Sequence, residues 1–161
     1  MADPGNPLRA PLTAAELMRF LPHRPPFFFL RRLVAWTPGA SAVSEVEFDG
    51  REEFFRGHFP GNPIVPGVIL VEAAAQTGGF ALAGSLDGSL PDGRMPALAK
   101  IRGMRFRAPA RPHELLHVEA RVASRFGAGG AVEVLVRRGD TRLAEGDLLL
   151  ALGAPPRSEL D

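Results

Sequence analysis

The chain has 161 residues, of which 45% are hydrophobic and 23% charged, and this composition excludes wholesale disorder and predicts one globular domain with a substantial core. The 19 basic and 18 acidic residues leave a net charge of +1, so the overall charge favours no strongly charged partner. Without cysteine the chain has neither disulfides nor thiol chemistry, and without a signal-like leader or a long enough apolar run we expect a cytoplasmic protein with no membrane span.

The first part of the chain predicts a loose arm, a short helix and a strand. Residues 1–11 are rich in proline, and we expect a flexible arm there. Thr13 and Glu16 have the spacing of a capping box, in which both side chains accept hydrogen bonds from free amides at a helix start. Pro22 ends this helix, and a strand is expected from Phe27 to Trp36.

Five further segments have the alternating or β-branched patterns of strands. They are Ala42–Phe48, Ala97–Arg107, Leu115–Phe126, Ala131–Arg138 and Thr141–Leu152. Glycine-rich hairpin signals separate the last three, and such short links force antiparallel pairing because a parallel sheet needs longer crossovers. Residues 154–161 are expected to form a flexible tail.

Residues 57–79 read GHFPGNPIVPGVILVEAAAQTGG and organise the rest of the chain. A loop of glycines and prolines leads into a segment, residues 68–82, which we expect to be a helix. Its only polar side chains are those of Glu72, Gln76 and Thr77. One long apolar helix with about five to six antiparallel strands predicts a single α+β domain over residues 12–153, with a curved sheet wrapped around the helix. One sheet of this size covers only part of such a helix, so we expect a dimer.

His58 and Glu72 are the candidates for acid–base chemistry. Histidine suits proton transfer near neutral pH, although His58 could instead serve only to bond a backbone group of its tight loop. Burial raises the pKa of a carboxyl group and favours its neutral, protonated form. In that form Glu72 could donate a proton. Gln76 lies one turn later and can hydrogen-bond this carboxyl. The alternative is a structural Glu72 paired with Arg24 or Arg105.

The start of the predicted helix is a candidate binding site for a carbonyl oxygen. The amides around Gly67 and Val68, after Pro66, have no partner within a helix and point partial positive charge outward. They could hold an oxygen on which negative charge develops, although an ordinary Pro-Gly helix start has the same sequence. A base, an acid and such a donor are together what elimination of water from a 3-hydroxyacyl thioester requires.

Three blocks carry a resemblance to a known family. They are Leu21-Pro22-His23-Arg24 with Pro26-Phe27, GHFPGNPIVPGVILVEAAAQ at 57–76, and Arg105-Phe106-Arg107 with Pro109. In this order the chain resembles the FabZ family of bacterial 3-hydroxyacyl-acyl carrier protein dehydratases over roughly residues 12–152. The resemblance implies a hotdog fold and dimers with two active sites at the interface, commonly assembled three to a hexamer. It also implies a substrate carried on the phosphopantetheine of acyl carrier protein, with no metal or redox cofactor.

Carried over by position, the resemblance implies that His58 is the catalytic base, that Glu72 of the partner subunit is the acid, and that the Gly67 amide binds the carbonyl. Pro66, Phe59 and Gln76 of the same blocks are interpreted as supporting residues. Relatives that also isomerise the double bond have aspartate where this chain has Glu72, so glutamate favours plain dehydration to the trans-2-enoyl product.

The chain departs from the family at Arg31, Lys100 and His113 and lacks the family's tyrosine gate, which leaves the acyl chain length and the pathway open, fatty acid or polyketide. Residues 94–111 contain six basic residues and no acidic one. Candidates to bind the acidic carrier protein or the phosphopantetheine phosphate are Lys100, Arg102, Arg105 and Arg107. The alternative is a solvated strand face. Apart from Phe106, aromatic side chains are not interleaved as in single-strand binders, which argues against nucleic acid.

Two other functions remain open on the sequence. A thioesterase of the same fold would also use a helix carboxylate but would hydrolyse the thioester, and such enzymes generally lack the GHFPG loop. A carrier-protein-binding subunit without catalysis is the non-enzymatic alternative, and the presence of both His58 and Glu72 argues against it.

Overall fold

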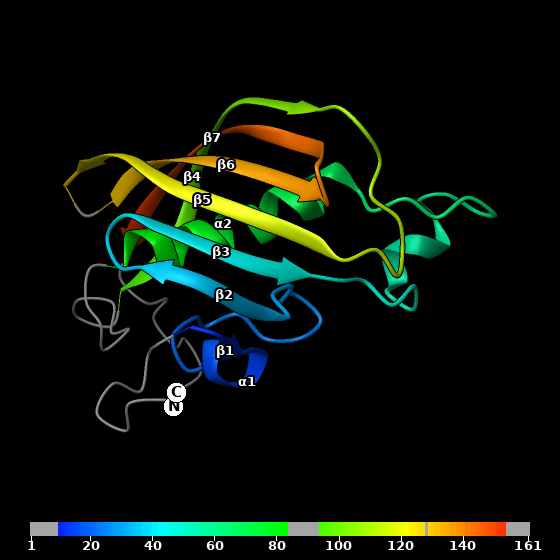
Figure 1. The fold of residues 1–161 in the computed structure, drawn as a ribbon, viewed down its shortest axis with the longest axis horizontal. Coiled ribbons are helices and arrows are strands. Elements are labelled where there is room, and N and C mark those ends of the chain that lie inside the picture. Colours follow the sequence, from blue (N-terminus) through cyan, green and yellow to red (C-terminus); the bar gives the residue numbers. More distant parts are fainter. Residues whose placement is uncertain (1–9, 84–93, 128, 154–161) are drawn as a thin grey trace, which may run out of the picture.

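One long helix, α2 (Gly67–Leu82), lies against a curved antiparallel sheet in the computed structural model of the chain (Figure 1). The structure describes residues 10–83, 94–127 and 129–153. The arm expected at residues 1–11 falls outside these ranges except for its last two residues, and the tail expected at 154–161 falls outside them altogether.

The sheet has seven strands in the order β1-β2-β3-β5-β6-β7-β4, and every neighbouring pair is antiparallel. Their bounds are β1 Leu12–Thr13, β2 Arg32–Thr37, β3 Ser41–Val46, β4 Met95–Phe106, β5 Leu116–Phe126, β6 Gly129–Arg138 and β7 Thr141–Gly153. The α+β architecture expected for a hotdog fold is therefore confirmed. The strand count slightly exceeds the predicted five to six because the two-residue β1 is too short to show a pattern in the sequence.

Two helical segments flank the long helix. The short helix α1 (Ala14–Leu17) begins with the predicted capping box, in which Glu16 Oε2 accepts from the Thr13 amide at 2.7 Å and Thr13 Oγ1 accepts from the Glu16 amide at 3.4 Å. A 3-10 helix (Glu53–Arg56) follows β3 and leads directly into the His58 loop.

The predicted strand over Phe27–Trp36 is wrong in its first half, because β2 starts only at Arg32. At Phe27 and Phe29 the backbone that precedes it bonds to a side chain of α2, whereas Arg31 N–H donates to the Glu45 carbonyl on β3 at 2.8 Å. Phe29 N–H donates to Gln76 Oε1 at 3.1 Å, and Gln76 Nε2 donates to the Phe27 carbonyl at 3.0 Å. Residues 27–29 are therefore held by the helix, and hydrogen bonding to the sheet begins at Arg31.

The sheet and the segments that precede β2 together cover most of α2. Every residue from Ala73 to Leu82 is buried, and Thr77 satisfies its hydroxyl by a 2.6 Å contact with Ser44 Oγ on β3 and a 2.9 Å bond to the Ala73 carbonyl. The first turn is different, since Val68 is 72% exposed. The exposed part of the helix is therefore its N-terminal end rather than its length.

Candidate active site

His58 lies in a loop closed by its own backbone. The His58 amide donates to the Phe54 carbonyl at 3.0 Å, and the His58 carbonyl accepts from Ile64 N–H at 3.0 Å. Phe59 stacks on the imidazole with 4.1 Å between ring centroids and 26° between planes. The 3-10 helix ahead of the loop and these bonds across it hold the histidine in one place, as the glycines and prolines of the sequence predict.

The imidazole of His58 is oriented by a backbone carbonyl. Its Nδ1 lies 2.9 Å from Ile64 O, and a carbonyl can only accept, so Nδ1 carries the proton of the neutral ring. Nε2 is then left with its lone pair as the basic nitrogen. The backbone contact considered as the structural alternative is therefore present, and it leaves Nε2 free of that bond.

A hollow of about 380 Å³ connects His58 to the start of α2. Its lining includes His58, Gly67, Leu70, Phe106, Arg107 and Pro109. Among the described residues, the N–H groups of Gly67 and Val68 have no acceptor, and no side chain caps this end of the helix. A Cβ on Gly67 would lie 2.9 Å from Phe106 Cε1, so only glycine lets this ring approach the helix start. A carbonyl oxygen in the His58 hollow would meet free backbone donors.

Glu72 lies on α2 with its side chain 19% exposed, and one of its oxygens receives two donors. Oε1 is 3.0 Å from Gln76 Nε2, the bond expected from the sequence, and 3.2 Å from His23 Nε2. The His23 hydrogen bond and, after it, the Gln76 bond outweigh burial and hold the pKa of Glu72 below its usual value. The expectation of a raised pKa is therefore wrong for this chain, because burial on an apolar helix says nothing of donors from another segment.

The arginines considered as partners of Glu72 are occupied or elsewhere. Arg24 Nη1 donates to the carbonyls of Leu21 and His23, both at 2.8 Å, and the partner that the carboxyl does have is His23. His23 is thus a residue of the site that reasoning from the sequence missed. Two features of the sequence could have indicated His23. It stands in the Leu-Pro-His-Arg block, and Glu72 is a carboxyl on an apolar helix that needs a hydrogen-bond donor.

Glu72 does not line the hollow that holds His58. At about 100° per residue, a position five residues after Gly67 is rotated by about 140° from it, and one two residues after Leu70 by about 160°. Glu72 therefore points away from the hollow of its own chain. In one chain the imidazole of His58 and the free amides of the helix start therefore lie on one side of α2, and the carboxyl of Glu72 lies on another.

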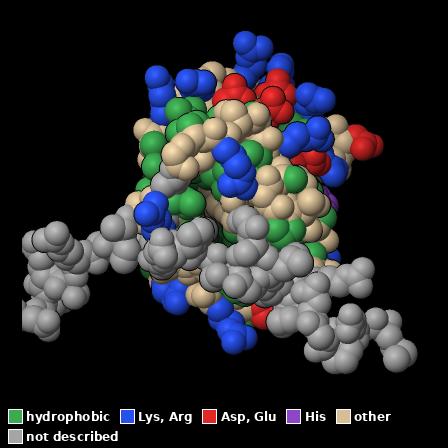
Figure 2. All heavy atoms as spheres, turned by 90° about the vertical axis from the view of Figure 1, so that its left-hand side faces the viewer, with side chains coloured by type: hydrophobic (Ala, Val, Ile, Leu, Met, Phe, Trp, Pro, Cys, Tyr) green, Lys and Arg blue, Asp and Glu red, His purple; other side chains and the backbone are tan. Residues whose placement is uncertain are grey.

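The four basic candidates lie on or directly after β4. Lys100, Arg102 and Arg105 are exposed, whereas Arg107 forms an ion pair with Glu145, with Nε 3.0 Å from Oε1. On the face shown in Figure 2, blue basic side chains stand among red acidic ones near the top rather than forming a uniform basic surface. The charge of Arg107 is already partly neutralised, which leaves the other three as the stronger candidates.

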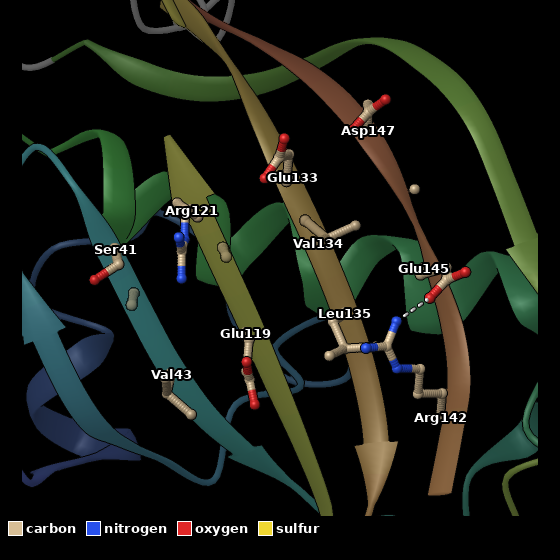
Figure 3. Close-up of a pocket in the computed structure, with 13 residues that line it drawn as sticks. Ser41, Val43, Glu119, Arg121, Glu133, Val134, Leu135, Arg142, Glu145 and Asp147 are labelled. Carbon is tan, nitrogen blue, oxygen red and sulfur yellow. Dashed lines mark hydrogen bonds and ion pairs between the residues drawn. The ribbon is translucent and has the colours of Figure 1, made fainter. Parts of the chain in front are cut away.

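A second hollow, of about 450 Å³, lies over β3, β5, β6 and β7 (Figure 3). Charged side chains of both signs line it, among them Glu119, Arg121, Glu133, Arg142, Glu145 and Asp147. Arg142 donates to Glu145 at 3.1 Å. This hollow contains no imidazole to act as a base, so the His58 hollow remains the candidate site.

In residues 10–83, 94–127 and 129–153 no three histidine, aspartate or glutamate side chains gather closely enough to hold a metal ion. Over the same part of the chain, no helix combines the length and apolar character needed to cross a membrane.

Residues 21–142 match the family described as FabA-like domain. The chain is also similar to proteins named 3-hydroxyacyl-[acyl-carrier-protein] dehydratase FabZ. One from Roseiflexus sp. (strain RS-1) is 41% identical over 89% of this chain and 98% of the relative. Another from Chloroflexus aggregans is 37% identical over 91% of this chain and 99% of the relative.

Solved structures share the fold at low identity. The dehydratase heterocomplex ApeI:P from Xenorhabdus doucetiae superposes with a TM-score of 0.68 at 18% identity, covering 89% of this chain and 93% of that one. An uncharacterised protein from Pyrococcus horikoshii gives 0.64 at 16% identity, covering 91% and 96%. At such identities the likeness supports the architecture alone.

Proposed function

We propose that this chain, which belongs to the FabZ family of 3-hydroxyacyl-[acyl-carrier-protein] dehydratases, removes water from (3R)-3-hydroxyacyl thioesters of acyl carrier protein to give trans-2-enoyl products in fatty acid or polyketide-type biosynthesis. The observation that carries the mechanism is the His58 hollow. There a ring with Nδ1 committed to the Ile64 carbonyl faces the unpaired amides that open α2.

Three groups take part in the proposed reaction: a base, a pair of backbone donors and an acid. His58 Nε2 takes the α-proton of the thioester, and the amides of Gly67 and Val68 stabilise the negative charge that develops on the carbonyl oxygen. A double bond forms between the α- and β-carbons as the bond from the β-carbon to the hydroxyl breaks. Glu72 gives a proton to the departing hydroxyl, which leaves as water. Transfer of the proton on His58 to solvent and uptake of one by Glu72 complete the cycle.

The acid in this scheme is Glu72 of the partner subunit, because Glu72 of the same chain points away from the His58 hollow. A homodimer has a suitable surface for this. Within the described residues β4 pairs only with β7, and its open side belongs to a long strand that carries exposed Leu98, Ile101 and Phe106. Three dimers that keep this interface can assemble into a hexamer.

The proposed substrate arrives on an acidic carrier protein. Lys100, Arg102 and Arg105 are exposed on the strand that borders the His58 hollow at Phe106, where they can steer the carrier protein or contact the phosphopantetheine phosphate. Arg107 is the weaker candidate because Glu145 already pairs with it. The proposed chemistry needs no cofactor besides the phosphopantetheine that carries the acyl chain.

The first test supplies 3-hydroxyacyl carrier protein of several chain lengths and follows the product by mass. Loss of one water from the acyl chain supports the proposal. Release of the free acid with unmodified carrier protein would instead identify a thioesterase, and an unchanged substrate at every chain length would leave only a carrier-protein-binding role.

A second test asks which chains build the site. Two subunits with different tags, one carrying His58→Ala and one carrying Glu72→Gln, are co-expressed and the mixed dimer is isolated. If the two residues act across the interface, one of the two sites is intact and the mixed dimer has about half of wild-type activity. If they act within a chain, neither site is intact, and an inactive mixed dimer would refute the shared arrangement. The two parental variants are the controls and should both be inactive.

A further inference from the structure

We propose that His23 is the positioning residue for Glu72, holding one carboxyl oxygen in place so that the other, Oε2, is the atom presented to the substrate. The inference rests on the proposed dehydratase function and adds a residue to it. His23 touches the carboxyl and not the reacting atoms, so its role is exercised through Glu72.

The two oxygens of Glu72 have different surroundings. Oε1 accepts from His23 Nε2 at 3.2 Å and from Gln76 Nε2 at 3.0 Å. Oε2 accepts no hydrogen bond from the residues that the structure describes. Two donors that converge on one oxygen fix the plane of the carboxyl group, and they leave the other oxygen free to meet a hydroxyl.

His23 lies on a segment whose backbone is held in place by hydrogen bonds from other side chains. Pro22 restricts the backbone before it, and Arg24 Nη1 donates to the His23 carbonyl and to the Leu21 carbonyl, both at 2.8 Å. Gln76, 1% exposed, exchanges two hydrogen bonds with the backbone at Phe27 and Phe29. Gln76 and Arg24 therefore hold the segment without help from the imidazole, whose one polar contact with the described residues is that with the carboxyl.

The state of the His23 ring follows from its second nitrogen. Nδ1 is buried and has no partner among the described residues. Nε2 lies 3.2 Å from Glu72 Oε1, and a carboxylate oxygen can only accept, so this contact places a proton on Nε2. That proton faces Glu72 Oε1, and His23 thus acts as a fixed donor to the carboxylate. Among the described residues, no other titratable or charged side chain acts on Glu72.

The decisive experiment compares pH–rate profiles of three variants. His23→Phe keeps a flat ring but removes the donor, His23→Gln restores a side-chain N–H, and His113→Asn, at an exposed histidine far along the sequence, is the matched control. Since the His23 bond is the largest cause that lowers the pKa of Glu72, its loss raises that pKa and moves the acid limb of the profile to higher pH.

For His23→Phe we expect kcat to fall by about 10-fold or more, as for the loss of a hydrogen bond to a charged group, with the KM nearly unchanged. The acid limb should move in His23→Phe, return toward the wild type in His23→Gln and stay in place in His113→Asn. An acid limb that does not move in His23→Phe would overturn the proposal, whether kcat falls or not, because a merely structural role lowers activity without shifting the profile.

A measurement on the unmodified ring keeps the proposal testable should His23→Phe fail to fold. Nitrogen chemical shifts of His23 in the wild-type protein should show the tautomer protonated on Nε2 at neutral pH, and Glu72→Gln should perturb them. A ring protonated on Nδ1, or one insensitive to Glu72→Gln, would refute the contact. Absence of enoyl product in the wild-type protein would instead count against the proposed function, which the nitrogen shifts do not test.

Discussion

Adding one methyl group at the start of α2 should slow the reaction without removing any donor. In Gly67→Ala the new Cβ would lie 2.9, 3.0 and 3.3 Å from three carbons of the Phe106 ring. Carbon atoms prefer about 3.5–4.0 Å, so the ring or the helix start must shift by about 0.5–1 Å. Phe106 is 50% exposed and can give way, which keeps the stability cost near the low end of overpacking, about 1 kcal/mol. A displacement of this size in a reacting site lowers the rate by up to about 100-fold.

The assay is steady-state turnover of a 3-hydroxyacyl carrier protein, with thermal unfolding measured alongside. We expect Gly67→Ala to lower kcat by about 10- to 100-fold while the protein stays folded. Phe106→Ala is the matched background, because it removes the ring that the new methyl group would strike. In that background Gly67→Ala should cost less than about 3-fold if the collision is the cause. An equal loss in both backgrounds would refute the reasoning and indicate that the methyl group obstructs the substrate itself.

Three further changes test other parts of the structure. His58→Gln should lower kcat by about 10²- to 10⁴-fold with an unchanged circular dichroism spectrum, and substantial activity would contradict its role as base. Gly78→Ala would place a Cβ 2.9 Å from Leu150 Cδ1, and urea denaturation should show about 1–3 kcal/mol less stability. Arg32 donates to Glu45 and lowers the pKa of that carboxyl, so its stabilisation is present above the unfolded pKa and lost as pH falls. Glu45→Gln should therefore destabilise at neutral pH but not in acid, and a loss equal at both would be inconsistent with this pairing.

The last four strands of the sheet could be predicted because the signals that set their limits are local in the sequence. The last four strands begin and end within two residues of the predicted limits, since alternating patterns and short glycine links fix them without reference to the rest of the chain. Phe27–Phe29 could not be placed in the same way. Its aromatic composition suits a strand, but the side chain of Gln76, 47 residues from Phe29, takes up its backbone hydrogen bonds.

The site shows the same division between local and distant information. Gln76 is four residues from Glu72, so a helix alone predicts their hydrogen bond, which is present at 3.0 Å. His23 is 49 residues away and reaches the carboxyl only because the segment before β2 is fastened to α2. Helical neighbours indicate burial but not this donor, and for that reason the direction of the pKa shift of Glu72 was predicted wrongly.

The lowered pKa of Glu72 is compatible with its proposed role as an acid. A carboxyl that is ionised at neutral pH can still deliver a proton if a small fraction of the enzyme carries it, and that fraction falls as the pKa falls. The same donors that lower the pKa hold Oε1, so the site trades a larger protonated fraction for a carboxyl fixed in one orientation. Proximity and orientation contribute several kcal/mol to catalysis, about 7–11 kcal/mol in well-oriented intramolecular reactions, whereas one pKa unit corresponds to about 1.4 kcal/mol. Orientation of the carboxyl can therefore offset a small loss of protonated enzyme, so donors around Glu72 do not contradict its proposed role as an acid.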